Sequence, residues 1–187
     1  MILAFAIAVG LAGALLRYRK DALNRIAALP LRFAWILIFA IILQIPLLRA
    51  PAVSSHDLRL QQALLLLSYL LLVVFVGLNW RITGIRVVGM GLGLNLLAIV
   101  ANGGFMPVTA QTLVRINPGS QLSDWTAGVH YPGSKDVIRL PQEIYFWVFS
   151  DLFILPPPFP LPTAFSLGDL LIALGIIWTL VSLPPVS

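Results

Sequence analysis

The sequence predicts an all-α membrane protein in which a single domain, residues 1–187, forms a five-helix transmembrane bundle. Three observations predict this class: 59% of the residues are hydrophobic, only 10% are charged, and the mean hydropathy is +0.96. A soluble domain carries about 25% charged residues. The apolar residues gather in separate runs, and about 20 such residues make a helix long enough to cross a bilayer.

Five apolar runs predict five membrane spans, at about residues 2–17, 33–48, 60–78, 84–102 and 167–183. An irregular, proline-rich outer segment, residues 105–164, separates the fourth span from the fifth and contains nine of the fourteen prolines. At the start of the fifth span, Ser166 and Asp169 have the spacing of a capping box.

The basic residues predict the orientation of the spans. Arg17, Arg19 and Lys20 directly follow the first span, and no basic residue precedes it. A cleaved secretory signal has the opposite order of charge, so we expect the first span to be retained. Because cytoplasmic loops are enriched in Lys and Arg, we place the N-terminus outside. Five crossings then place the C-terminus inside.

Small residues predict where the spans pack together, with the fourth span as the central helix. Gly89 and Gly93 lie four residues apart in this span, and helices in lipid approach one another closely at such positions. Gly10 in the first span and Gly175 in the last predict further close contacts. Asn95 is the one strongly polar side chain inside the fourth span. It should face protein, because lipid offers its amide no partner.

The composition excludes several kinds of site and partner. The chain has no cysteine, which rules out disulfides, iron–sulfur clusters and thiolate zinc sites. Its two histidines, His56 and His130, fall in the predicted outer loops, and no ionisable residue lies near the middle of a predicted span. We therefore predict no metal site, no cofactor and no proton-coupled transport. The net charge of +5 is explained by basic helix ends, so no nucleic-acid partner is predicted.

Asp151 and Asp169 form the candidate catalytic pair, because both are predicted to lie at the outer membrane surface. Two nearby carboxyl groups can share a proton, so that one activates a water and the other acts as an acid. The simpler interpretation is structural. Asp169 then caps its helix together with Ser166, and Asp151 forms hydrogen bonds within the outer segment.

Two resemblances add to this interpretation. The stretches F-S-D-L-F and F-S-L-G-D-L-L, residues 149–153 and 165–171, resemble the second half of the lipoprotein signal peptidases, in which two such aspartates are catalytic. Val148, Leu152, Ser166 and Gly168 depart from the motifs of those enzymes.

The second resemblance rests on N-L-L-A-I-V-A-N-G-G-F-M-P-V at residues 95–108, the F-P-L-P run at 159–162 and S-L-G-D-L-L-I-A-L-G at 166–175. The C-terminal half in this way resembles a family of small bacterial multi-pass proteins, the domain of unknown function 5317. This resemblance implies the bacterial inner (plasma) membrane and implies no activity.

The predicted function is that of a non-catalytic accessory or structural subunit of a larger bacterial membrane complex, with lipid and other proteins as its partners. Small-residue helix faces and spans without charge suit such a subunit. One alternative is an aspartyl hydrolase at the outer leaflet that uses Asp151 and Asp169. Another is a lipid or quinone binder, with Trp147 and Phe149 lining a groove under the aromatic segment 143–155.

Overall fold

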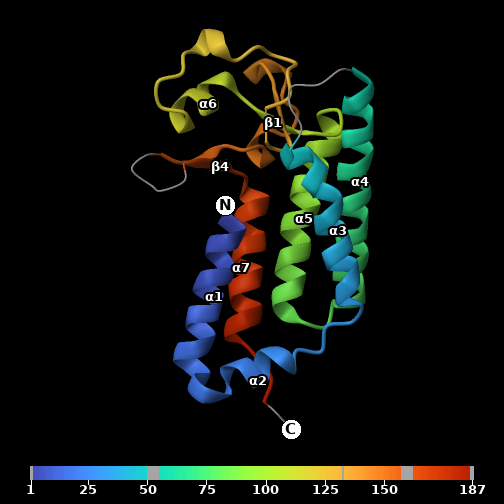
Figure 1. Cartoon of the computed structure of the whole chain (residues 1–187), viewed down its shortest axis with the longest axis vertical. Helices are drawn as coiled ribbons and strands as arrows, with labels where there is room; N and C mark the ends of the chain where they lie inside the picture. Colours follow the sequence, from blue (N-terminus) through green and yellow to red (C-terminus); the bar gives the residue numbers. More distant parts are fainter. Residues whose placement is uncertain (1, 50–54, 132, 157–161, 186–187) are drawn as a thin grey trace.

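Five long helices run alongside one another, and a smaller folded segment covers one of their ends (Figure 1). The helices are α1 (Ile2–Tyr18), α3 (Ala34–Arg49), α4 (Ser55–Leu78), α5 (Thr83–Ala101) and α7 (Leu167–Val181). We call residues 103–165 the cap, and the opposite end of the helices the far end. The structure is a computed structural model that describes residues 2–49, 55–131, 133–156 and 162–185. Residues 157–161 of the predicted proline-rich segment lie outside this part.

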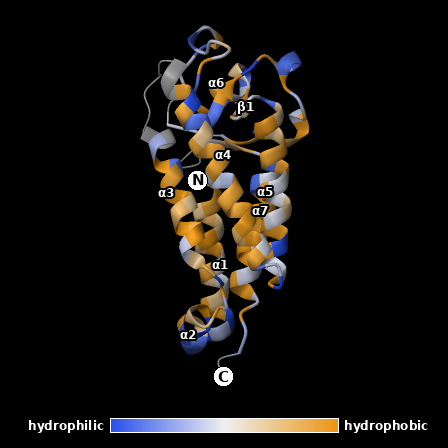
Figure 2. Cartoon of the chain, turned by 90° about the vertical axis from the view of Figure 1, so that its right-hand side faces the viewer, coloured by the Kyte–Doolittle hydropathy of each residue, from blue (hydrophilic) through white to orange (hydrophobic). Residues whose placement is uncertain are grey.

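Three helical stretches are long and apolar enough to cross a membrane: Ile2–Ala27, Leu58–Leu78 and Thr83–Ala101. Helices α3 and α7 are also apolar but shorter. Hydrophobic residues dominate the helices, and hydrophilic residues gather around α2 and in the cap (Figure 2). Helix α4 begins at Ser55, before the predicted start at residue 60, because the helix continues beyond the apolar run.

The helices lie in the order α1, α7, α5, α4, α3, with α5 in the centre. The contact between α5 and α7 is the most extensive one, followed by α1 with α7, α3 with α4, and α4 with α5. The two ends of the chain lie near opposite ends of the α1–α7 pair (Figure 1). The central position predicted for residues 84–102 therefore agrees with the arrangement of the helices.

Glycines bring the backbones of α5 and α7 into direct contact. A Cβ atom on Gly175 would lie 2.6 Å from the carbonyl oxygen of Gly84, and one on Gly168 would lie 2.6 Å from the carbonyl oxygen of Gly91. Neither distance leaves room for a side chain. The contact is thus of the small-residue kind that holds helices together in lipid.

The other glycines singled out from the sequence lie in different surroundings. A Cβ atom on Gly10 would lie 2.7 Å from the side chain of Leu180 in α7, and one on Gly89 would lie 2.6 Å from the side chain of Val76 in α4. Around Gly93 no heavy atom of the described chain lies within 4 Å of the Cβ position. Gly84 and Gly91, rather than Gly89 and Gly93, make the close contact of α5 with α7.

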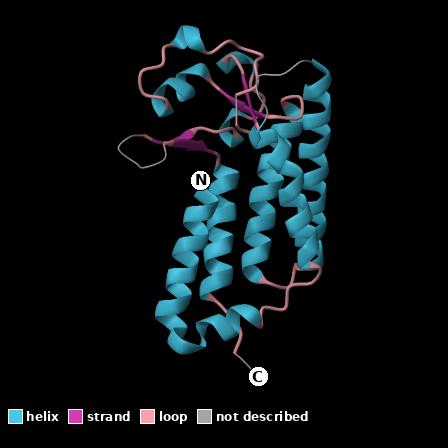
Figure 3. Ribbon diagram, viewed as in Figure 1, coloured by secondary structure: helices cyan, strands magenta, loops and turns pink. Residues whose placement is uncertain are grey.

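The chain is mostly helical, as predicted, but the described part of the cap contains two small sheets, so the all-α class does not extend to this segment and the segment is not wholly irregular (Figure 3). Strand β1 (Met106–Val108) pairs in parallel with β2 (Asp136–Ile138), and β3 (Phe153–Leu155) pairs antiparallel with β4 (Thr163–Phe165). Each strand has three residues, too few to show an alternating pattern in the sequence. Strands β1 and β2 lie about thirty residues apart in the chain, so the tertiary fold brings them together, whereas β3 and β4 are consecutive strands.

Short helical turns connect the strands and complete the far end. The cap also contains α6 (Ala110–Ile116) and the 3-10 turns η2 (Leu122–Asp124), η3 (Pro141–Glu143) and η4 (Trp147–Phe149). At the far end, η1 (Arg19–Asp21) and α2 (Ala22–Ala27) follow α1. There Arg17 and Tyr18 donate hydrogen bonds to the carbonyl oxygen of Val181, at 3.1 and 2.8 Å. These donors satisfy a carbonyl that the end of α7 leaves without a helical partner.

Candidate functional site

A cluster of polar side chains lies where the cap meets the helices. The helices contribute Tyr69 of α4, Asn95 of α5, and Ser166 and Asp169 at the start of α7, and the cap contributes Lys135, Asp136 and Asp151. We call these seven residues the junction cluster. Buried polar groups are costly unless they are paired, so the partners of each group decide what the cluster can do.

Asp169 uses both of its carboxylate oxygens. Its backbone N–H donates to Ser166 Oγ at 3.0 Å, and the N–H of Ser166 donates to Asp169 Oδ2 at 3.3 Å, so the predicted capping box is present. Asp169 Oδ1 accepts a hydrogen bond from Asn95 Nδ2 at 2.7 Å and lies 3.6 Å from Lys135 Nζ. The negative charge of Asp169 is therefore held by a helix end, an amide and an ammonium group.

Asn95 joins α5 to the first turn of α7. Its side chain is fully buried, and it donates to Asp169 while its Oδ1 accepts from Ser166 Oγ at 2.7 Å. Gly168 makes this approach possible, because a Cβ atom there would collide with Asn95 Oδ1. Asn95 thus faces protein and supplies a specific hydrogen-bond connection as well as helix packing.

Lys135 brings a positive charge to the cluster from the residue before β2. Its position follows from the β1–β2 pairing, in which the N–H of Met106 donates to the Lys135 carbonyl oxygen at 3.1 Å. The side chain is 25% exposed. Burial alone would lower the pKa of its amine, but the carboxylate of Asp169, and after it the other acidic groups of the cluster, raise the pKa well above its ordinary value. Lys135 therefore stays charged.

Asp151, unlike Lys135, lies where its charged form is disfavoured. It lies just after η4 and is only 5% exposed, and its Oδ1 is buried with no hydrogen-bond partner. Burial and then the charge of Asp136 raise the pKa of Asp151 well above its ordinary value, against the opposing effect of Lys135. The surroundings of Asp151 therefore favour its neutral, protonated form, whereas the partners of Asp169 favour its carboxylate.

The tendency of Asp136 to ionise lies between those of Asp151 and Asp169. It is partly exposed, and its Oδ1 is buried without a partner. Burial raises the pKa of Asp136 to about 6, although Lys135 acts to lower it. The candidate pair Asp151 and Asp169 therefore belongs to one cluster, and Asp136 is a third carboxyl group that acts on both.

The aromatic segment is anchored to the end of α5. Asn102 Oδ1 accepts from the N–H of Tyr145 at 3.0 Å, and Asn102 Nδ2 donates to the Tyr145 carbonyl oxygen at 2.8 Å. Trp147 is exposed, whereas Phe149 is partly buried against the core. The two residues predicted to line one groove therefore lie in different surroundings.

His130 is buried in the cap, with its ring edge-on to Phe105 at a centroid distance of 5.2 Å. Both ring nitrogens lack hydrogen-bond partners, and burial lowers the pKa of the imidazole. Among the residues that the structure describes, no three His, Asp or Glu side chains are grouped so that they could hold a metal ion. The side chain of His56 lies outside the described part.

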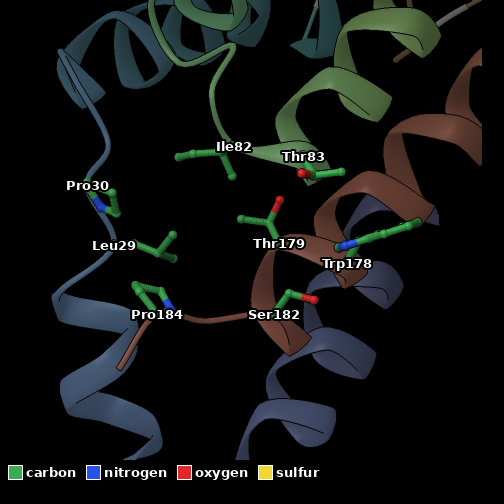
Figure 4. Close-up of a pocket in the computed structure, with 9 residues that line it drawn as sticks. Leu29, Pro30, Ile82, Thr83, Trp178, Thr179, Ser182 and Pro184 are labelled. Atoms are coloured by element: carbon green, nitrogen blue, oxygen red, sulfur yellow. The ribbon is translucent and has the colours of Figure 1, made fainter. Parts of the chain in front are cut away.

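A pocket of about 250 Å³ lies at the far end, away from the junction cluster (Figure 4). Its lining consists of Leu29, Pro30, Ile82, Thr83, Gly84, Trp178, Thr179, Ser182 and Pro184. These residues provide hydroxyl groups and apolar surface but no acid or base. The pocket and the titratable groups are therefore separate features of the molecule.

Sequence reasoning singled out Asp151, Asp169 and Asn95 but missed Tyr69, Lys135 and Asp136. The missed residues lie in different elements, and only their tertiary placement brings them next to the others. One signal was present: Lys135 and Asp136 are adjacent charged residues in a chain with few charges.

Comparison with known protein families gives a match to a family of unknown function (DUF5317) over residues 28–181. No curated protein and no solved structure matches the chain, and the resemblance to lipoprotein signal peptidases is unsupported. The matched region contains α3, α4, α5, α7, the cap and the whole junction cluster. Because the match extends over more than half of the sequence, the chain belongs to the DUF5317 family.

Proposed function

We propose that this chain is an integral, multi-pass protein of the bacterial plasma membrane and a non-catalytic accessory or structural subunit of a larger membrane complex. In this proposal all five long helices cross the bilayer, with the N-terminus outside and the C-terminus inside. The three helices of spanning length and the apolar character of α3 and α7 support the crossings.

The distribution of charged and aromatic residues supports the orientation. The helix ends and connections at the far end contain seven basic residues, Arg17, Arg19, Lys20, Arg25, Arg32, Arg81 and Arg86, as expected for a cytoplasmic side. The cap exposes Tyr145, Phe146 and Trp147. Aromatic side chains of this kind are typical of the boundary between lipid and water, which suits a cap at the outer surface.

The proposal that the chain is a subunit of a complex rests on an exposed face of the central helix, α5. On α5, Met90, Leu97 and Val100 are 53%, 41% and 60% exposed, and Gly93 lies on the same face with open space around it. We call these four residues the α5 stripe. Their spacing of three and four residues places them along one side of a helix. A transmembrane helix of a partner protein could approach α5 at Gly93 as closely as α7 approaches it at Gly91.

The state of Asp169 supports the non-catalytic part of the proposal. A catalytic base needs a free oxygen that can accept a proton from a substrate or a water. Both oxygens of Asp169 are already engaged by Ser166, Asn95 and Lys135. These interactions join the cap, α5 and α7, which is a structural role.

Cross-linking from the α5 stripe tests the proposal. A photo-reactive side chain in place of Leu97, activated in intact cells, should give one discrete adduct with another membrane protein. Gly93→Leu should abolish this adduct and reduce the size of the particle purified in mild detergent. The matched control is Gly77→Leu in α4, which also has no atom within 4 Å and should change neither result.

Adducts with lipid alone would contradict the proposal, as would an unchanged particle size in Gly93→Leu. Because Gly93 has open space within the chain itself, the leucine should not disturb folding. Equal thermal unfolding midpoints of the isolated wild-type and variant chains would verify this.

The junction cluster supports a second candidate, an aspartyl hydrolase acting at the outer leaflet. Asp151, whose surroundings raise its pKa, belongs to the same cluster as Asp169, which is paired with Lys135, and two carboxyl groups in different surroundings are the combination that such hydrolysis uses. The purified chain should then cleave membrane-embedded peptides, and Asp151→Asn should abolish the cleavage. A chain without hydrolytic activity in lipid vesicles would contradict this candidate.

A further inference from the structure

The junction cluster contains more negative than positive groups. Three carboxyl groups, those of Asp136, Asp151 and Asp169, act on the single amine of Lys135. Asp169 also receives hydrogen bonds from Asn95 and Ser166 and forms the ion pair with Lys135 at 3.6 Å. Lys135 is therefore already paired with Asp169, and neither of the other two carboxyl groups forms an ion pair within the part of the chain that the structure describes.

These two carboxyl groups are incompletely bonded. Oδ1 of Asp136 and Oδ1 of Asp151 are both buried without a hydrogen-bond partner, and Asp151 as a whole is almost completely buried. An ionised carboxylate cannot remain in such a place at low cost, because burial removes its hydration. Asp136 is also the charged residue that acts most strongly on Asp151.

We propose that Asp136 and Asp151 form a proton-binding site at the junction of the cap and the helices, which holds one proton at neutral pH beside the Lys135–Asp169 ion pair. The bound proton makes Asp151 neutral and leaves Asp136 ionised. The charge of Asp136 opposes ionisation of Asp151, and two like charges that act on each other in a poorly hydrated site do not both persist. This inference does not depend on whether the protein has a partner.

The groups that face this site set the direction of its pH dependence. The charges of Lys135 before β2 and Asp169 from α7 act on both Asp151 and Asp136, and Tyr69 from α4 interacts with Asp151. The pKa of Asp151 is raised well above that of an unfolded aspartate, and the pKa of Asp136 is raised to about 6. The folded chain therefore binds more protons than the unfolded chain above pH 5, and its stability falls as the pH rises through these folded pKa values.

Unfolding of the full chain in mixed micelles, followed by tryptophan fluorescence from pH 6 to pH 8, tests the site. For each proton that only the folded state holds, the unfolding equilibrium constant rises about tenfold per pH unit. Asp151→Asn replaces the protonated acid by a neutral group of the same shape. The ratio of the wild-type to the Asp151→Asn constant should therefore rise with pH across this range, by up to about tenfold per pH unit, with the variant the more stable at pH 8.

His130 makes this comparison with a variant necessary. Burial lowers the pKa of His130, so its contribution to stability is lost as the pH falls through the ordinary histidine range, opposite in sign to that of the proton site. The ratio of wild type to variant cancels this contribution. Asp124→Asn, at an exposed position of the cap, is the matched control, and its ratio should not change with pH.

Infrared spectroscopy gives a second, direct measurement. The carbonyl stretch of a protonated carboxyl group should be present at pH 7 in the wild type and absent in Asp151→Asn. In Asp136→Asn the band should disappear at a lower pH than in the wild type, because the charge that favours protonation of Asp151 is gone. A ratio independent of pH, or a band unaffected by Asp151→Asn, would overturn the proposal.

Discussion

At each end of the molecule, an asparagine at the end of a helix forms hydrogen bonds with a distant segment of the chain. At the far end, Asn79 closes α4: its Nδ2 donates to the carbonyl oxygens of Arg32 and Phe75 at 3.0 and 2.9 Å, and its Oδ1 accepts from the N–H of Arg32 at 2.7 Å. At the cap end, Asn102 closes α5 and pairs with Tyr145 in the same two-way manner. Each asparagine satisfies a helix end and holds a remote segment of chain.

The two ends differ in where their charges lie. At the far end, Arg17 and Arg25 reach backbone carbonyls from positions at or near the surface. At the cap end, Lys135 and three aspartates lie within the junction. Charges inside a protein are costly to desolvate and are strongly affected by the loss of a partner. The far end is therefore held mainly by hydrogen bonds to the backbone, whereas the cap end also depends on protonation and charge.

The largest loss of stability should come from a change in the contact between α5 and α7 beneath the cap. Gly168→Ala places a methyl group against Asn95 Oδ1 and the backbone of Gly91, and overpacking of this kind costs about 3 kcal/mol. Denaturant unfolding in micelles should measure this loss. Gly93→Ala is the control. It has open space and should stabilise α5 by up to about 1 kcal/mol, so equal losses in both variants would contradict the assigned contact.

Removing one partner of the ion pair should have a slightly smaller effect. Asp169→Asn keeps the size of the side chain but leaves Lys135 without its closest negative charge. Breaking a fully buried pair costs about 3 to 5 kcal/mol. Because Lys135 is partly exposed, we expect about 2 kcal/mol after allowance for solvent screening.

The effect of Asp169→Asn should be opposite in sign to that of Asp151→Asn at pH 8. The two variants should therefore be compared in the same unfolding experiment. Destabilisation of similar size by both would mean that the two aspartates are not in the different states assigned to them.

The smallest of these effects should show whether the two ends of the molecule open independently. Asn102→Ala and Asn79→Ala each remove the hydrogen bonds of one asparagine side chain, at a cost of about 1 kcal/mol. Limited proteolysis should show new cleavage in the cap for Asn102→Ala, and around residues 28–33 for Asn79→Ala. The same cleavage pattern in both variants would show that the two ends do not open independently.

Most of the helical frame could be predicted from local features of the sequence. Long apolar runs, charged ends and the Ser166–Asp169 capping box placed the five helices within a few residues of their observed bounds, except for the early start of α4. These signals are local, because periodicity, hydropathy and caps depend on residues a few positions apart. Asn95 could be expected to face protein for the same reason, since a polar group in an apolar run has few alternatives.

Only the tertiary structure decided which residues meet. The three-residue strands of the cap are too short for a pattern, and the β1–β2 pairing that positions Lys135 joins segments about thirty residues apart. Whether Gly91 or Gly93 contacts α7 depends on how α5 is turned toward α7. The ionisation of Asp151 and Asp169 likewise depends on burial and on partners supplied by other elements, because the electrostatic energy of a charge is set by its surroundings in space.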